Sequence, residues 1–309
     1  MAASLTFAAI SKFNNNFFAI KQRKQGVNIM STAVAITAAD INKLRQATGA
    51  GMLDCRKALT QAEGDFEGAI DWLRKQGQKV AAKRSDREAK EGVVIAQTTA
   101  DHKTGYIITI SCETDFVSKN ADFVAFVQGI ADAAVANNVD SAEALGEVLV
   151  NGAKVSDLIN DKLAAIGEKI EIVRFEKVVA PFVASYIHGA YRMGVLVAFN
   201  SEAGDAGKDV AMQIAAMNPL AVDADSVPAA VVERERAIVV ETMKADPKMA
   251  GKPDEMISKI AEGKLNAFFK EQTLLAQAFV KDPNLTISAY LKTVKADLQV
   301  LDFKRVAIG

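Results

Sequence analysis

The chain has 309 residues, of which 50% are apolar, 24% charged and 6% aromatic, and its formal net charge is −1. This composition excludes a disordered chain, and the sequence lacks the run of about 18 apolar residues that a membrane span needs. Two cysteines are too few for a disulfide framework, so a reducing compartment is expected. The near-zero charge argues against direct nucleic-acid binding.

The charge is unevenly distributed along the chain. Residues 1–39 contain no Asp or Glu and carry +4, so the remaining 270 residues carry −5. We treat residues 1–35 as a leader outside the fold. Its basic cluster follows its apolar part, the reverse of a secretory signal. An organelle transit peptide and upstream sequence before a true start at Met30 are the other interpretations, so we expect a cytoplasmic protein or, with a transit peptide, one of the organelle matrix.

Residues 36–77 predict three short helices. Thr37 and Asp40 have the spacing of a capping box at the start of the first helix. We expect Leu53 to face inward from the second helix, and the third helix to end at Gly77. Three helices of this length form a small bundle of the ubiquitin-associated type, which is usually an interaction module.

A basic stretch follows the three helices. Residues 74–90 carry a net charge of +5 without an aromatic residue, so nothing here can stack on a nucleic-acid base. We interpret residues 78–91 as a solvated linker. A contact with an acidic partner or with RNA phosphates is the alternative, and it would make the protein a binding adaptor.

The remaining sequence predicts an α+β fold with two related halves, residues 92–180 and residues 181–226 with 273–309. Each half contains the order strand, strand, helix, strand, which favours a small antiparallel sheet with helices on one face. The expected elements are a hairpin over 92–112, a helix near 121–136, strands near 170–176, 185–190 and 195–200, a helix over 209–216, and a last strand V-L-D-F-K-R-V.

Residues 227–272 interrupt the second half with an apparent helical hairpin. The helical period of apolar residues breaks at Asp246-Pro247 and again at Gly251-Lys252-Pro253. Two interpretations remain open: a simple packed pair of helices, or a coiled-coil arm that docks on a partner or on a second copy.

The sequence gives little support to an enzyme. A thiol enzyme would need Cys112 as nucleophile and His188 as base, and no pattern places them together. Gly204-Asp205-Ala206-Gly207-Lys208-Asp209 is too short for a phosphate-binding loop and has Asp where a hydroxyl is needed, so we interpret it as a turn before a helix. We expect no cofactor, no metal site and no direct nucleotide binding.

The most unusual segment is Glu113-Thr114-Asp115-Phe116-Val117, at a junction between a predicted strand and a predicted helix. Such junctions are usually polar, yet here a phenylalanine stands beside an acid. Phe116 either packs into its own core or forms an apolar wedge, with a carboxylate beside it, that is presented to a partner.

Four segments resemble the elongation factor Ts family, in the family's order. They are T-G-A-G-M-L-D-C-R-K-A-L at 48–59, C-E-T-D-F-V-S-K-N at 112–120, H-G-A-Y-R-M-G-V-L-V at 188–197 and A-M-Q-I-A-A-M-N-P at 211–219. The first two are long and specific. The resemblance covers residues 36 to 305.

The resemblance implies a guanine nucleotide exchange factor that acts on elongation factor Tu without covalent chemistry. It implies that Thr114, Asp115, Phe116 and Val117 dislodge the partner's magnesium ion, and that Asp115 and Phe116 insert beside its switch helices. It also implies two groups of partner contacts. The group facing the partner's G domain is Arg45, Met52, Leu53 and Arg56, and the group pressing near its phosphate loop or on a further domain is Met212 and Gln213.

The chain departs from the family pattern at some points. Gln213 stands where the family commonly has His, so the contact expected there stays polar but carries no charge. Arg56 replaces the usual Lys, which keeps that position cationic. Some relatives also have a C-terminal module, whereas this chain ends at Gly309, soon after the last predicted strand.

Overall fold

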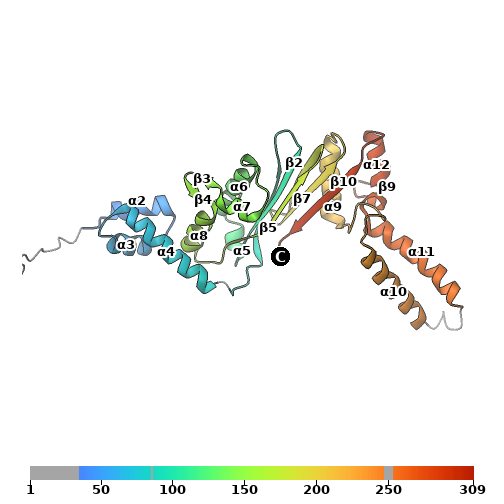
Figure 1. Ribbon diagram of the computed structural model, residues 1–309, viewed down its shortest axis with the longest axis horizontal. Coiled ribbons are helices and arrows are strands. Elements are labelled where there is room, and N and C mark those ends of the chain that lie inside the picture. Colours follow the sequence, from blue (N-terminus) through green and yellow to red (C-terminus); the bar gives the residue numbers. More distant parts are fainter. Residues whose placement is uncertain (1–34, 85, 247–252) are drawn as a thin grey trace, which may run out of the picture.

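The computed structural model describes residues 35–84, 86–246 and 253–309 (Figure 1). The expectations for the leader therefore lie outside the described residues, apart from its last position. Helices α2 (Ala38–Thr48), α3 (Met52–Gln61) and α4 (Phe66–Arg84) pack at one end around a small core of their own. The predicted capping box is confirmed, because the Thr37 hydroxyl accepts from the Asp40 amide and the Asp40 carboxylate accepts from the Thr37 amide.

The predicted end of the third helix at Gly77 is wrong. Helix α4 continues to Arg84, so residues 78–84 are helical and not an open linker. Gly77 serves another purpose, which is close contact with α8 (Val155–Ile166). A Cβ at Gly77 would lie 2.9 Å from Ala164 Cβ and 3.2 Å from the Asn160 carbonyl oxygen, so only glycine allows the two helices to approach this closely.

Two three-stranded antiparallel sheets follow, and they share one topology. The first has the order β1-β2-β5, built from β1 (Glu91–Thr98), β2 (Thr104–Cys112) and β5 (Glu171–Val179). The second has the order β6-β7-β10, built from β6 (Phe182–His188), β7 (Met193–Phe199) and β10 (Val300–Ala307). In both, the second strand along the chain is central.

The two sheets pack face to face in the centre of the molecule (Figure 1). Their shared core consists of Val94, Ala96, Ile107, Val178, Val183, Leu196, Ala198 and Val306. Gly105 marks how close the sheets are, because a Cβ there would lie 2.7 Å from Val183 and 2.8 Å from Leu196. The expectation of helices on one face of each sheet is therefore completed by a second sheet on the other face. Packing on both faces explains why both central strands are buried along nearly their whole length.

Helices cover the outer faces of the sheets. Helix α6 (Ala121–Ala136) packs on the first sheet, as predicted, through Phe123 and Val127 among others. Helix α9 (Asp205–Met217) packs on the second. The turn expected at residues 204–209 is wrong: Gly204, at φ +51°, precedes the helix, and residues 205–209 already belong to it. The strand expected at 185–190 ends earlier, at His188, because Gly189, Ala190 and Tyr191 all take positive φ.

The remaining elements are short, except for one helical pair. The small elements are α5 (Asp115–Ser118), α7 (Ala142–Glu147), β3 (Leu149–Val150), β4 (Ala153–Lys154), η2 (Leu274–Ala276), β8 (Ala278–Phe279), β9 (Asp282–Thr286) and α12 (Ile287–Val294). Helices α10 (Ala229–Ala245) and α11 (Asp254–Gln272) project from the second half as an antiparallel pair (Figure 1). They share a small apolar cluster of Met243, Ile257 and Ala261. No helix in the described ranges is long and apolar enough to cross a membrane.

Candidate functional site

The candidate site is the tight turn between β2 and α6. Strand β2 ends at the buried Cys112, and the single helical turn α5 begins at Asp115. Asn120 then caps α6 by accepting from the amides of Asp122 and Phe123. Helix α5 therefore lies in the short connection between the end of β2 and the start of α6.

Phe116 points away from the protein core. It is 85% exposed, the largest value among the exposed large apolar side chains of the described ranges. Its neighbours Cys112, Ser118 and Phe123 are buried. The alternative in which Phe116 packs into its own core is therefore wrong. An exposed aromatic ring beside a carboxylate is the arrangement expected of a contact with another molecule.

Asp115 lies beside Phe116 with its negative charge intact. Its Oδ2 atom accepts from Lys119 Nζ at 2.7 Å, one helical turn along the chain. This hydrogen bond and the lysine's positive charge hold the pKa of Asp115 below its usual value. The turn therefore presents an ionised carboxylate and an apolar ring from adjacent positions.

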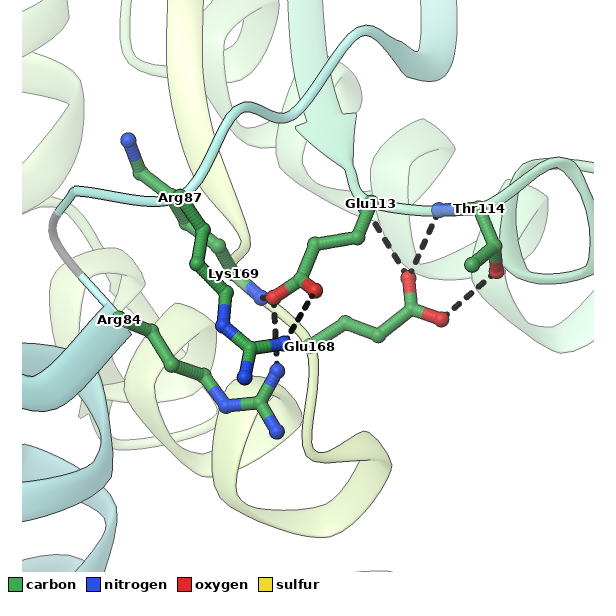
Figure 2. Close-up of polar contacts among 6 residues, drawn as sticks. All are labelled: Arg84, Arg87, Glu113, Thr114, Glu168 and Lys169. Carbon is green, nitrogen blue, oxygen red and sulfur yellow. Dashed lines mark hydrogen bonds and ion pairs between the residues drawn. The ribbon is translucent and has the colours of Figure 1, made fainter.

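Glu168 anchors the start of the turn (Figure 2). It lies in the loop between α8 and β5, far along the chain from the residues that it binds. Its Oε2 atom accepts from the amides of Glu113 and Thr114, both at 3.0 Å. Its Oε1 atom accepts from the Thr114 hydroxyl at 2.6 Å. One side chain thus fixes the backbone immediately before Asp115.

Glu113 makes the reciprocal contact (Figure 2). Its carboxylate accepts from the Lys169 amide at 2.7 Å, from Arg84 at 2.7 Å and from Arg87 at 3.0 Å. Partial burial raises the pKa of Glu113, but the bonds from the Lys169 amide and from the two arginines outweigh it and lower the pKa to about 2. The carboxylate is therefore ionised throughout the neutral range.

Those two arginines change the interpretation of the basic stretch at residues 74–90. Arg84 ends helix α4, and Arg87 lies just beyond it. Both neutralise a carboxylate of the same chain, at the base of the candidate site. Arg74 is likewise placed near Asp161, at 3.7 Å. Arginines that pair with carboxylates of the same chain do not belong to the freely solvated linker that the sequence suggested. Fewer positive charges are therefore left to contact RNA phosphates.

A cleft of about 700 Å³ opens beside the turn. Its lining comes from α2, α4 and α8 and from the turn and α6, and it includes Phe116 and Val117. Its other apolar lining residues include Ile70, Phe126, Leu158 and Ile166. The exposed ring thus stands at the edge of an apolar groove.

The structure places the other predicted contacts apart from the turn. Arg45 lies on α2, and Met52, Leu53 and Arg56 lie on α3, all of them exposed. Leu53 is 73% exposed, so the expectation that it faces inward from its helix is wrong. Helices α2 and α3, which carry these four exposed side chains, lie at one end of the molecule (Figure 1). The candidate site is therefore an extended surface and not one pocket.

Gln213 is not accessible for a direct contact with a partner. It lies on α9 with its side chain fully buried, and both the oxygen and the nitrogen of its amide form hydrogen bonds within the chain. It donates to Gln277 and to the Ala278 carbonyl, both at 3.1 Å, and accepts from the Val280 amide at 2.9 Å. The expected direct contact through Gln213 is corrected accordingly: this side chain holds the loop at β8. Met212 beside it is partly exposed.

The thiol hypothesis fails on geometry and on ionisation. Cys112 is fully buried, and burial raises the pKa of its thiol to about 12. His188 instead contacts the Tyr186 hydroxyl, at 2.9 Å. A thiol that stays protonated at neutral pH is a poor nucleophile. Within residues 35–84, 86–246 and 253–309, no cluster of His, Cys, Asp and Glu is arranged to hold a metal ion.

No sequence pattern predicts the roles of Glu113 and Glu168 beneath the turn. Glu113 belongs to the unusual segment, but only the four residues that follow it were assigned a role. Glu168 stands 55 residues from Glu113 in the chain, with no motif around it. A bond between such distant positions leaves no local pattern in one sequence, so only the folded chain reveals it.

Comparison with known proteins now adds to this picture of a mixed helix-and-sheet protein with an exposed contact surface. A family model described as Elongation factor TS matches residues 113–309. Elongation factor Ts of Christiangramia forsetii is 47% identical over 277 residues, which is 89% of this chain and 99% of that protein.

Other relatives give the same result. Elongation factor Ts of Amoebophilus asiaticus is 47% identical over 89% of this chain and 100% of its own length. That of Alcanivorax borkumensis is 41% identical over 87% and 93%. The class is therefore that of translation elongation factors. Within it, the chain belongs to the elongation factor Ts family.

Proposed function

We propose that this chain is the guanine nucleotide exchange factor of elongation factor Tu. It binds the GDP form of that partner, displaces magnesium and promotes GDP release so that GTP binds. The observation that carries the proposal is Phe116, 85% exposed on a braced turn beside an ionised carboxylate. This turn is the T-D-F-V segment of the family to which the chain belongs.

The mechanism is differential binding. An exchange factor must bind the nucleotide-free partner more tightly than the nucleotide-bound one. Burying the Phe116 ring between partner helices that have moved apart contributes about 1.5–3 kcal/mol, available only in the shifted state. Asp115 adds a negative charge near phosphates that depend on magnesium, which weakens the hold on both. By linkage, either nucleotide weakens the binding of the factor in return.

The other surfaces supply affinity. Arg45, Met52, Leu53 and Arg56 bind the G domain of the partner, and Met212 on α9 contacts a further domain. Gln213 supports that second contact from within, by holding the loop at β8 against α9. No step makes or breaks a covalent bond, so the protein needs neither a cofactor nor nucleotide of its own. It acts in the cytoplasm, where its partner works.

We divide the chain to match these roles. Residues 36–84, up to the end of α4, are a ubiquitin-associated-like unit, and the chain up to residue 91 connects it to the core. The core comprises residues 92–180 as one half and residues 181–226 with 273–309 as the other. The helical pair of residues 227–272 is an insertion into the second half.

The test is release of a fluorescent GDP from elongation factor Tu, followed by stopped flow. We expect Phe116→Ala to slow stimulated release about tenfold or more, since truncating a buried Phe removes most of its burial energy. Because the ring is exposed in the free protein, the melting temperature should stay unchanged. Val179→Ala is the matched control, as Val179 is 70% exposed on β5, outside the candidate site. Release at the wild-type rate by the Phe116 variant would exclude the assigned site.

A further inference from the structure

Helix α5 cannot orient itself. It is one turn long, Asp115–Ser118, and Thr114 at its start makes no side-chain capping bond to it. An isolated turn of this length is unstable in water, because nucleation fixes several residues for very few hydrogen bonds. The direction in which Asp115 and Phe116 point must therefore be set from outside the turn.

Two crossed carboxylates provide that restraint (Figure 2). The Glu168 side chain holds the amides of Glu113 and Thr114, while the Glu113 side chain holds the amide of Lys169. Each segment thus binds the backbone of the other. Hydrogen bonds that backbone N–H groups donate to a carboxylate are stronger than those between neutral groups.

The arginines extend the restraint to another element. Arg84 and Arg87 both bind Glu113, whose side chain is only 16% exposed. Arg84 is the last residue of α4, so the turn is connected to the three-helix unit as well as to the loop before β5. The brace therefore joins three segments at the base of the candidate site.

We propose that Glu168 and Glu113 are positioning residues for nucleotide exchange. They act through Phe116 and Asp115, by holding α5 in the direction in which the ring enters the partner. Without the brace the turn samples other directions and must be ordered during binding. The loss is about tenfold in rate for each backbone residue that has to be ordered. This inference rests on the proposed function.

The experiment is a double-mutant cycle in the full-length chain. Glu168→Ala and Glu168→Gln are each made alone and together with Phe116→Ala, and GDP release is measured over a range of factor concentrations. Gln retains one acceptor oxygen for the two amides, and its NH2 group can only donate to the Thr114 hydroxyl, so this variant removes the negative charge and reverses one bond with little change in volume. Glu147→Gln is the control, because Glu147 is another carboxylate that accepts a hydrogen bond, from Lys154, but lies away from the turn.

We expect the Glu168 variants to lower the maximal release rate about tenfold, with a smaller change in the half-saturating concentration, since the surface on α2 and α3 is intact. In the Phe116→Ala background the same changes should cost clearly less, about threefold or below, because only Asp115 then remains to be positioned. Faster amide hydrogen exchange across residues 113–118 should accompany the loss.

Two results would overturn the positioning role. One is a wild-type maximal rate in both Glu168 variants. The other is an equal loss with and without the Phe116 ring, which would show that the glutamate does not act through it. Either result leaves the exchange role standing if Phe116→Ala alone is slow, whereas a fast Phe116 variant would dismiss the proposed function first.

Discussion

At the scale of single residues, the site combines an exposed apolar group with buried charge. Phe116 lies outside the core, whereas the carboxylate of Glu113 beneath it is largely enclosed and neutralised by arginines. The usual distribution, with apolar groups inside and charges outside, is reversed within four residues of chain. Each departure has a cost in the free protein. The ring remains in contact with water, and the carboxylate is stable only while its partners are present.

The ionisation of Glu113 gives a direct check. Its pKa in the folded protein lies at about 2, below the ordinary value of 4.5 for a glutamate. The brace is therefore complete above about pH 4.5, and its contribution to stability is lost as the pH falls from there towards about 2. Side-chain carboxyl ¹³C shifts should show this low pKa.

Arg84→Gln and Arg87→Gln test whether these two arginines lower the pKa of Glu113. Each removes one positive partner, so each should raise the pKa of Glu113 towards its usual value, with the larger rise when both are changed. Lys119→Gln, which removes a lysine from Asp115 instead, should leave Glu113 unchanged. A Glu113 pKa that stays at its ordinary value in the wild-type chain would contradict the contacts described for it.

At the scale of elements, one glycine decides how α4 and α8 pack. Gly77 lies in the middle of a helix, where glycine normally costs about 1 kcal/mol relative to alanine. The loss is accepted here because the backbone of α8 occupies the space that a Cβ would need.

Alanine substitutions at two helical glycines should therefore have opposite effects. Gly263→Ala, in α11, meets no atom within 4 Å and should stabilise the protein by about 0.5–1 kcal/mol. Gly77→Ala should destabilise it by about 1–3 kcal/mol, because the added methyl forces α4 from α8. Denaturant unfolding of both variants provides the comparison, and a stabilising Gly77→Ala would show that the two helices are not in close contact.

Local rules predicted the elements well where both partners are near in sequence. Thr37 with Asp40 marked a helix start, and the β-branched runs around the turn at residues 101–105 marked a hairpin. The same rules wrongly predicted a helix end at Gly77. A single sequence does not distinguish a glycine that ends a helix from one that allows a neighbouring helix to approach closely. The second sheet, the burial of Gln213 and the Glu168 contacts depend on distant segments, and no periodicity records them.

At the scale of the whole molecule, the two sheets form one structural unit. Leu196 is fully buried in their shared core, so its loss affects both. We expect Leu196→Ala to cost about 2–5 kcal/mol. Calorimetry should show both sheets melting in one transition that moves to lower temperature. Leu301→Ala is the control, since Leu301 is half exposed on β10 and should change little. Separate melting of the two sheets would contradict a shared core.

Under the proposed function, the close crossing of α4 and α8 also bears on how a partner is captured. It fixes the surface of Arg45, Met52, Leu53 and Arg56 and the Phe116 turn on one rigid body. Once the first surface is engaged, the second meets its target as an intramolecular event, at an effective concentration set by geometry and not by the amount of protein. A weak contact at the turn then suffices, and a weak contact separates quickly, which suits a factor that must leave its partner and act again.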